Sequence, residues 1–213
     1  MNNFYKETFL KFFFSLTLSL IIIFLSQNDA LWLNFWGFLK VPPVLPPFSD
    51  FDALNIFLSY KQDGFNPYFE NPESHPIHKF LIYPSVWLNL TDILYLNKDI
   101  NFKIVSFLIL FTYFYVFIDF YLRFKNKIFG FFLIIFFFST SNFLLIERLN
   151  VEIILFCFTY FAVVNKKVII QFIFYFISLI LKIFPIFSIF IFISKKKLFF
   201  LTLVFSIIYL LLI

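Results

Sequence analysis

The sequence predicts an all-α fold, a polytopic bundle of transmembrane helices with one large extracytoplasmic loop after the first helix. Two observations predict it: 62% of the 213 residues are hydrophobic, and apolar runs alternate with short polar segments. Globular chains contain about 45–50% apolar residues, so this excess needs a solvent that tolerates it, and the bilayer core is such a solvent. Because the helices need one another to bury their polar groups, we treat residues 1–213 as a single membrane domain.

The predicted spans are seven apolar runs. The first follows Lys6 and contains Lys11 near its start, which is also the pattern of a signal peptide. Because no small-x-small cleavage site follows it, we expect a retained span with a cytoplasmic N-terminus. At the end of the second run Asp119 and Arg123 are four residues apart, a spacing that predicts a local ion pair without a catalytic role. The seven runs are 9–26, 102–122, 128–146, 151–165, 168–182, 183–194 and 198–213.

The fifth and sixth runs are shorter than the roughly 20 residues that a helix needs to cross a bilayer. One alternative is a single span from 168 to 194 that is kinked at Pro185, because proline lacks an N–H and clashes with the preceding turn. That version puts Lys195–Lys197 outside, against the distribution of the other basic residues. We therefore favour two short helices that meet near Lys182 and Pro185.

Charge predicts the orientation of the chain. With a cytoplasmic N-terminus and one crossing per run, the loop of residues 27–101 lies outside and holds eight acidic residues against four lysines. Cytoplasmic loops carry an excess of Lys and Arg, so we expect a multi-pass protein of the inner (plasma) membrane whose first loop is extracytoplasmic. The basic clusters that then lie inside are Arg123/Lys125/Lys127, Lys166/Lys167 and Lys195–Lys197.

Composition argues against several classes of partner. The net charge of +5 does not indicate a nucleic-acid partner, because the lysines are scattered at the ends of apolar runs and form no basic face. Cys157 is the single cysteine, which excludes an internal disulfide and a paired thiolate metal site. His75 and His78, with two glutamates nearby, are candidate ligands of a divalent metal. Because Pro76 lies between them, we expect two exposed loop histidines and no metal or other cofactor.

The outer loop is predicted to hold short interfacial helices and several turns, with residues 85–90 (SVWLNL) as a short apolar stretch suited to lying in the interface. Residues 53–62 form one helix, and the carboxylate of Asp50 or Asp52 is placed to cap it. Four closely spaced prolines favour an extended backbone before the helix, and Asp63-Gly64 is a helix stop. The residues that fit an aromatic belt at the membrane surface are Trp32, Trp36, Tyr68, Tyr83 and Trp87.

Several short motifs follow one another in a distinctive order. After the first span come Asp50 and Asp52, then G-x-x-P-Y, N-P and Y-P-x-x-W in the outer loop, and further along E-R-L-N-x-E and K-x-x-P. They occupy Gly64–Tyr68, Asn71-Pro72, Tyr83–Trp87, Glu147–Glu152 and Lys182–Pro185. In this order the motifs resemble those of membrane glycosyltransferases of the GT-C superfamily, and family 87-like proteins in particular.

The resemblance covers about residues 30–190, the N-terminal half of a typical family member. We therefore expect an N-terminal portion of such a protein, or a naturally short one. Two positions depart from the E-R-G-N-x-D pattern of the family. Leu149 stands where the family has Gly, which alters how closely backbone and substrate approach. Glu152 stands where the family has Asp and keeps the carboxylate.

The resemblance implies the transfer of a sugar, mannose-like or another hexose or pentose, from a polyprenyl-phosphate carrier. The acceptor is a lipid-linked or cell-envelope molecule on the outer face. Such a transfer needs a base that takes the proton of the acceptor hydroxyl, and a carboxylate within hydrogen-bond reach is suited to this. Asp52 is the first candidate base and Asp50 the second. The alternative for either residue is helix capping.

The phosphate of the departing carrier needs cations near the lipid headgroups. Arg148 and Lys182 are the candidates, because Arg grips phosphate bidentately and Lys acts as a point charge. The alternatives are a salt bridge from Arg148 to Glu147 or Glu152, and snorkelling of Lys182 to the headgroups. The residues predicted to help bind the sugar are Asn150, Glu152, Tyr68 and Tyr83.

Two other interpretations stay open. One is a non-catalytic multi-pass protein, such as a transporter or flippase, and the other is an inactive truncated family member. Transporters tend to place polar sites near the bilayer midplane and to contain repeats, whereas the polar residues here are predicted to gather at one face. That distribution favours chemistry on a lipid substrate at the membrane surface.

Overall fold

The computed structural model describes residues 2–70, 81–94, 96, 98–123, 127–182, 202–204 and 206. Among these residues every element of regular structure is an α-helix, as the sequence predicts. The helices are α1 Asn2–Leu25, α2 Asp29–Phe38, α3 Ser49–Gln62, α4 Val86–Ile93, α5 Asp99–Arg123, α6 Lys127–Phe137, α7 Thr140–Arg148, α8 Glu152–Val164 and α9 Val168–Leu181.

The chain divides into two compact units by the density of its internal contacts. The first unit contains residues 1–81 and 88–154, and the second contains residues 82–87 and 155–213. Compactness does not decide whether the units fold independently, so the single membrane domain over residues 1–213 stays a prediction.

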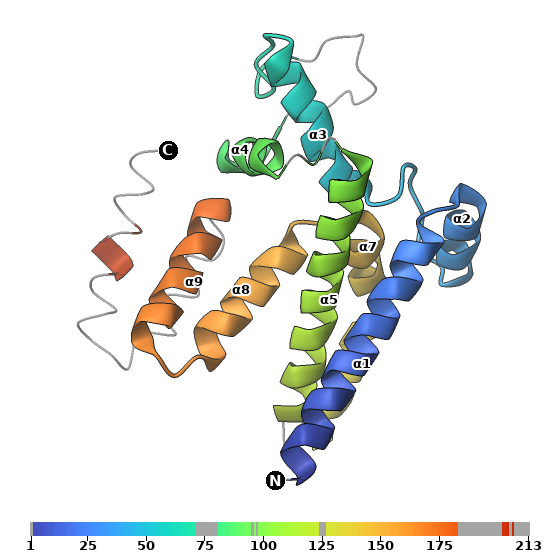
Figure 1. The fold of residues 1–213 in the computed structure, drawn as a ribbon, viewed down its shortest axis with the longest axis vertical. Helices are drawn as coiled ribbons and strands as arrows, with labels where there is room; N and C mark the ends of the chain where they lie inside the picture. Colours follow the sequence, from blue (N-terminus) through green and yellow to red (C-terminus); the bar gives the residue numbers. More distant parts are fainter. Residues whose placement is uncertain are drawn as a thin grey trace. The chain divides into compact units, whose positions relative to one another are not determined.

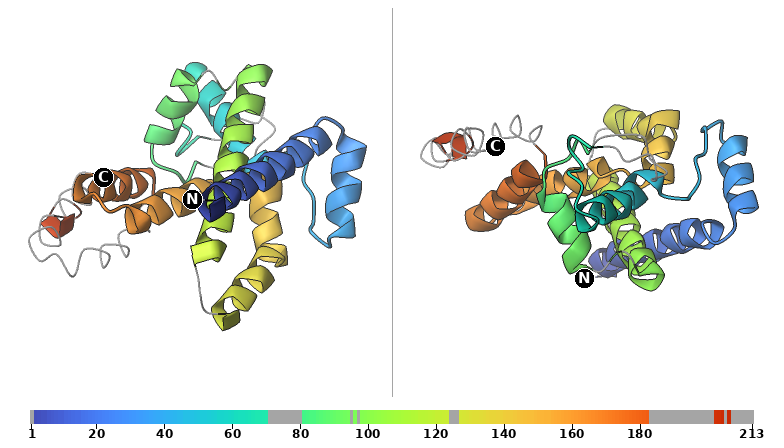
Figure 2. Two further views of the ribbon diagram at one scale, coloured as in Figure 1. Left: turned by 60° about the horizontal axis from the view of Figure 1, so that its bottom comes forward. Right: turned by 90° about the horizontal axis from the view of Figure 1, so that it is seen from above.

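Helices α1 and α5 are the two described helices that are long and apolar enough to cross a membrane on their own. They contain 24 and 25 residues, and a helix of that length extends about 36 Å, more than the ~30 Å hydrocarbon core. They pack against each other, and Figures 1 and 2 show them side by side and antiparallel. The chain therefore leaves α1 and enters α5 at the same end of the pair.

The contact between these two helices is made close by small side chains. Ser15 and Ser19 on α1 and Ser106 on α5 are fully buried. Ser15 and Ser19 donate their hydroxyl protons to backbone carbonyls of α1 itself, at Lys11 and Ser15. Small residues of this kind let helix backbones approach closely in a bilayer. Large apolar side chains elsewhere on α1, such as Phe9 and Phe24, are exposed and suit contact with lipid.

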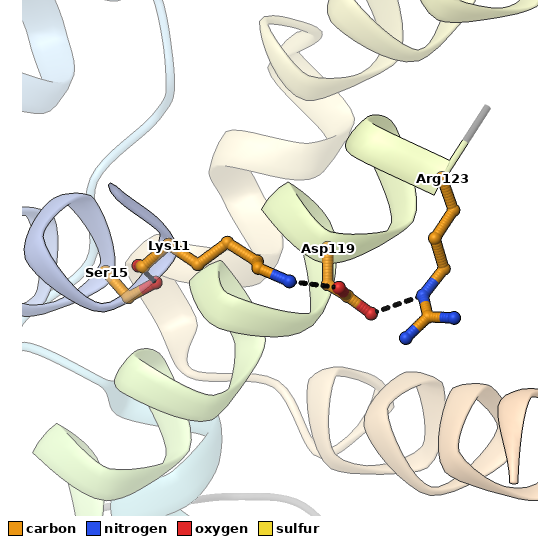
Figure 3. Close-up of polar contacts among 4 residues, drawn as sticks. All are labelled: Lys11, Ser15, Asp119 and Arg123. Atoms are coloured by element: carbon orange, nitrogen blue, oxygen red, sulfur yellow. Dashed lines mark hydrogen bonds and ion pairs between the residues drawn. The ribbon is translucent and has the colours of Figure 1, made fainter. Parts of the chain in front are cut away.

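An ion cluster joins α1 and α5 near the N-terminus of α1 (Figure 3). Arg123 Nε lies 2.6 Å from Asp119 Oδ2, so the predicted local pair is confirmed. The second oxygen of this carboxylate lies 2.7 Å from Nζ of Lys11 on α1, a contact that sequence spacing did not predict. Asp119 thus connects two helices as well as stabilising its own.

The predicted span over residues 128–146 is broken into α6 and α7, which meet at an angle of 49°. Ser139 caps α7 by accepting a hydrogen bond from the backbone N–H of Asn142. The side-chain amide of Asn142 donates to the carbonyl of Phe137 at the end of α6, and the hydroxyl of Tyr113 on α5 donates to its oxygen. Two backbone groups at the break, the N–H of Asn142 and the carbonyl of Phe137, therefore have side-chain partners. A broken helix in a bilayer needs such partners for its freed backbone groups.

The outer-loop helix differs from its prediction at the N-terminal end. Helix α3 begins at Ser49, so Asp50 and Asp52 lie inside its first turn, and the helix has no side-chain cap. The predicted capping role is therefore wrong; two carboxylates in the first turn instead complement the positive end of the helix dipole. The predicted stop is confirmed, because α3 ends at Gln62 and Gly64 adopts a φ of +89°.

Helix α2 was not predicted, and it changes the interpretation of two tryptophans. Trp32 and Trp36 are 0% and 1% exposed, so their predicted place in an aromatic belt at the membrane surface is wrong. They lie four residues apart on one face of α2, and their rings are in contact. Trp32 also packs on Phe48 and Trp36 on Phe143. The pair forms the core between α2, α7 and the segment before α3.

In the second unit the described helical structure includes α8 from Leu155 onward, α9 and residues 202–204 and 206. The predicted runs 151–165 and 168–182 coincide with α8 and α9 to within a residue. Their 13 and 14 residues make them short apolar helices, as expected. Phe158 and Phe161 pack on Phe174 between them. The predicted span 183–194, Pro185, Lys195–Lys197 and most of 198–213 lie outside the described residues.

Candidate functional site

The acidic start of α3 lies against the end of α7. The side-chain amide of Asn150 donates to Asp50 Oδ2 over 2.6 Å, joining residues that are 100 positions apart in the chain. Nearby, the backbone N–H of Phe48 donates to the carbonyl of Glu147 over 3.3 Å. Two segments that carry separate sequence motifs are therefore in direct contact in the first unit.

The turn after α7 places Asn150 for this role. Helix α7 ends at Arg148, and its C-cap residue Leu149 adopts the left-handed conformation at φ 47° while being only 1% exposed. The turn directs the chain into α8, and Asn150 Oδ1 accepts a hydrogen bond from the backbone N–H of Glu152 at the start of α8. Asn150 thus uses its amide oxygen to hold its own turn and its amide nitrogen to hold Asp50.

Glu147 and Arg148 form the charged pair at the end of α7. The side chain of Glu147 is fully buried, and Oε2 lies 3.7 Å from Arg148 Nε. Its other oxygen, Oε1, accepts hydrogen bonds from the backbone N–H of Val44 at 2.8 Å and from Trp32 Nε1 at 3.3 Å. The salt bridge from Arg148 to Glu147, one of the alternatives for Arg148, is therefore present. The Arg148 side chain is still 32% exposed, although its Nε atom is buried.

Asp52 lines an open pocket of about 310 Å³ in the first unit. The pocket lies where the end of α1, the start of α3 and the start of α5 meet. Asn55 donates a 3.1 Å hydrogen bond to Asp52, and Lys103 forms a 2.7 Å ion pair with Asp99 across one turn of α5. The lining residues are polar (Ser26, Asp52, Asn55, Asp99, Lys103) and apolar (Pro46, Pro47, Phe48, Leu96, Phe102).

The lining of this pocket suits a polyhydroxylated ligand. Carboxylate and amide oxygens accept hydrogen bonds from hydroxyl groups, and the lysine ammonium supplies a donor and a positive charge. Proline and phenylalanine supply apolar walls, as small-molecule sites usually do. The sequence analysis identified Asp52 and missed Asn55, Asp99 and Lys103. The helical spacings Asp52/Asn55 and Asp99/Lys103 are the signal that could have found them.

A second polar cluster lies within the second unit. Lys182 follows α9, and its Nζ lies 5.7 Å from the centre of the Tyr83 ring, a cation–π geometry. Tyr83 also contacts Trp87, whose indole N–H donates to the carbonyl of Leu181 over 2.8 Å. The sequence predicted Tyr83 and Lys182 as substrate-binding residues without relating them to each other.

The predicted site residues therefore form two groups. In the first unit Asp50 is hydrogen-bonded to Asn150, and Arg148 and Glu152 are close to Asn150 along the chain. Asp52 lies in the same turn of α3 as Asp50, and it lines the pocket. Tyr68 lies beyond the opposite end of α3. Tyr83 and Lys182 belong to the second unit. The substrate-binding and catalytic roles of these residues stay predictions.

The described residues bear on the predicted absence of a metal site. Within residues 2–70, 81–94, 98–123 and 127–182, no group of three or more His, Cys, Asp or Glu residues is placed to hold a metal ion. The candidate ligands His75 and His78 lie outside the described residues. The expectation that the protein holds no metal or other cofactor stays a prediction.

No protein-family model, curated protein or solved structure matches this chain. The GT-C resemblance therefore stays a prediction that depends on the sequence motifs and on the arrangement of their residues.

Proposed function

We propose that this chain is a GT-C-type membrane glycosyltransferase, or the N-terminal portion of one. It transfers a sugar from a polyprenyl-phosphate carrier to a lipid-linked or cell-envelope acceptor. The observation that carries the proposal is the arrangement at the start of α3. Asp50 is bonded to Asn150 of the E-R-L-N-x-E motif, while Asp52 in the same helical turn lines an open polar pocket.

The proposed face of the membrane follows from the direction of α1 and α5. Ser26 and Asp99 at the pocket lie at the end of the pair that is opposite to Arg123. About 20 residues of α5 separate the pocket from Arg123, which corresponds to roughly 30 Å along the helix. If the basic end is cytoplasmic, as the charge distribution favours, the pocket is extracytoplasmic. The carrier would then be bound in the outer leaflet of the inner (plasma) membrane.

In the proposed reaction the hydroxyl oxygen of the acceptor attacks the anomeric carbon of the sugar. A new carbon–oxygen bond forms as the bond to the carrier phosphate breaks, and the phosphate leaves with the bonding electron pair. Asp52 takes the hydroxyl proton, which it later releases to water. Arg148 and Lys103 are cations on the first unit that can stabilise the negative charge of the leaving phosphate.

The experiment is a transfer assay in membrane vesicles from cells that express the full-length protein, with a radiolabelled polyprenyl-phosphate sugar as donor. Asp52→Asn is compared with Asp92→Asn, a change at an exposed aspartate of α4. General-base catalysis contributes about 10²- to 10⁴-fold, so Asp52→Asn should lower kcat by at least about 100-fold while Asp92→Asn stays near the wild-type rate.

Two results would count against the proposal. Undiminished transfer by correctly inserted Asp52→Asn protein would remove Asp52 from the role of base. Carrier-lipid translocation without any transfer by the wild-type protein would instead identify a flippase-like, non-catalytic function.

A further inference from the structure

Glu147 contacts three successive parts of the outer loop. Its carboxylate accepts hydrogen bonds from Trp32 on α2 and from the backbone of Val44, and its own carbonyl accepts one from Phe48, the residue before α3. The Glu147 side chain is 0% exposed. A carboxylate buried to this extent is costly unless it is hydrogen-bonded and paired. These contacts are therefore expected to form together, which fixes the path of the chain into the first turn of α3.

The second carboxylate oxygen of Glu147 faces Arg148. Oε2 and the Nε atom of Arg148 are 3.7 Å apart, and both are buried without a hydrogen-bond partner within the described part of the chain. At that distance the two groups attract each other electrostatically but do not form a direct hydrogen bond. The attraction holds the Nε edge of the guanidinium inward. The Arg148 side chain as a whole is 32% exposed, so part of it is accessible from outside the protein.

We infer that Glu147 is a positioning residue for the proposed transferase site. It holds the start of α3, and with it Asp52, against the end of α7, and it orients the guanidinium of Arg148 toward the phosphate of a polyprenyl-phosphate lipid. The role in orienting Arg148 rests on the proposed function. The role in holding α3 does not, because it is a property of the fold.

The first test measures hydrogen exchange in the protein reconstituted into lipid nanodiscs. Glu147→Ala removes both acceptor oxygens, so the amide of Val44 should exchange at least about tenfold faster, which corresponds to ~1.4 kcal/mol of lost protection. Glu147→Gln keeps one side-chain acceptor oxygen and should retain most of the protection. Glu7→Ala, at an exposed glutamate of α1, is the matched control. Exchange within twofold of wild type in Glu147→Ala would overturn the holding role.

The second test measures the Kd of polyprenyl phosphate without its sugar, so that it does not depend on turnover. Glu147→Gln and Arg148→Gln should each weaken binding, by about tenfold for the loss of a charge-assisted contact. The double variant should be no weaker than Arg148→Gln alone, because Glu147 acts through Arg148. Independent, multiplying effects, or an absence of binding by the wild-type protein, would overturn the orienting role.

The two tests separate failure of this inference from failure of the proposed function. If polyprenyl phosphate binds with the expected coupling but no sugar is transferred, the positioning role stands and the transferase proposal fails. If sugar is transferred but Glu147→Ala leaves the exchange of the Val44 amide unchanged and Glu147→Gln leaves the Kd of polyprenyl phosphate unchanged, the transferase proposal stands and Glu147 is not a positioning residue.

Discussion

The Asp119 carboxylate should contribute far more to stability than an ordinary helix-surface carboxylate. Its side chain is 9% exposed, and that of its partner Lys11 on α1 is 13% exposed, so the ion pair is largely buried. Removing one partner of a buried pair costs about 3–5 kcal/mol, because the other charge is left buried. Arg123 is 57% exposed, so that pair adds only about 0.3–0.5 kcal/mol. We expect Asp119→Leu to lower the free energy of unfolding by about 3 kcal/mol.

Asp99→Leu is the matched control for the stability measurement, because Asp99 also pairs with a lysine four residues away on α5. In that pair the lysine and aspartate side chains are 39% and 78% exposed. Its loss should cost about 1 kcal/mol or less, including the favourable position of a carboxylate in the first turn of a helix. The assay is reversible unfolding by sodium dodecyl sulfate in mixed micelles, followed by tryptophan fluorescence.

A double variant tests the physical reason for the difference. Lys11→Met combined with Asp119→Leu leaves no buried unpaired charge between α1 and α5, and such replacements are often neutral. The double variant should therefore be more stable than Asp119→Leu alone. The reasoning would be refuted if Asp119→Leu cost no more than Asp99→Leu, or if removing Lys11 as well gave no recovery.

Three further predictions concern the first unit and use the same unfolding assay. Tyr113→Phe removes the hydroxyl that donates to the buried amide oxygen of Asn142, and it should lower the free energy of unfolding by about 1 kcal/mol. A change smaller than about 0.3 kcal/mol would show that the bend between α6 and α7 does not need this hydrogen bond. Leu149→Gly relieves about 1 kcal/mol of strain from the left-handed backbone but loses about 3 kcal/mol of packing from the buried leucine side chain. The variant protein should therefore be less stable than the wild type, and a more stable variant would contradict the packing role of Leu149. Asn150→Ala should cost about 1–2 kcal/mol by removing the partner of Asp50, and it should also lower transfer in the vesicle assay, since the start of α3 is then less firmly held.

The positions of the helices were largely predictable, because each apolar run of sufficient length has one favourable state in a bilayer. Helices α5, α8 and α9 match predicted runs to within three residues, whereas α1 begins at Asn2, seven residues before the predicted run 9–26. The helix stop at Gly64 follows from a glycine at a positive φ. The break between α6 and α7 falls at the polar segment Ser139–Asn142, which interrupts the apolar run and which the prediction of one continuous span passed over. A single sequence does not show that Asn142 has a partner on another helix, the hydroxyl of Tyr113.

The sequence named some residues of the candidate site and none of their long-range contacts. The motifs drew attention to Asp50 and Asn150, but a hydrogen bond between positions 100 apart leaves no periodic signal in a single sequence. The buried contact between Trp32 and Glu147 spans 115 positions and was missed for the same reason. A tryptophan next to a membrane span is usually interpreted as a surface anchor, and only the fold reveals that this one has a buried carboxylate as its partner.

The two aspartates at the start of α3 have different surroundings. Residues two apart on a helix point in directions about 200° apart, so they cannot face the same partner. Asp50 faces Asn150 at the end of α7, whereas Asp52 lines the pocket with Asn55. Both carboxylates accept a hydrogen bond from an amide, at 2.6 Å for Asp50 and 3.1 Å for Asp52, but only Asp52 of the two lines the pocket. Asp52 is therefore the better candidate for the base in the proposed transfer. Its position depends on the anchoring of Asp50. Asp50→Asn should therefore lower stability and transfer together, while Asp52→Asn lowers transfer and leaves the unfolding free energy nearly unchanged.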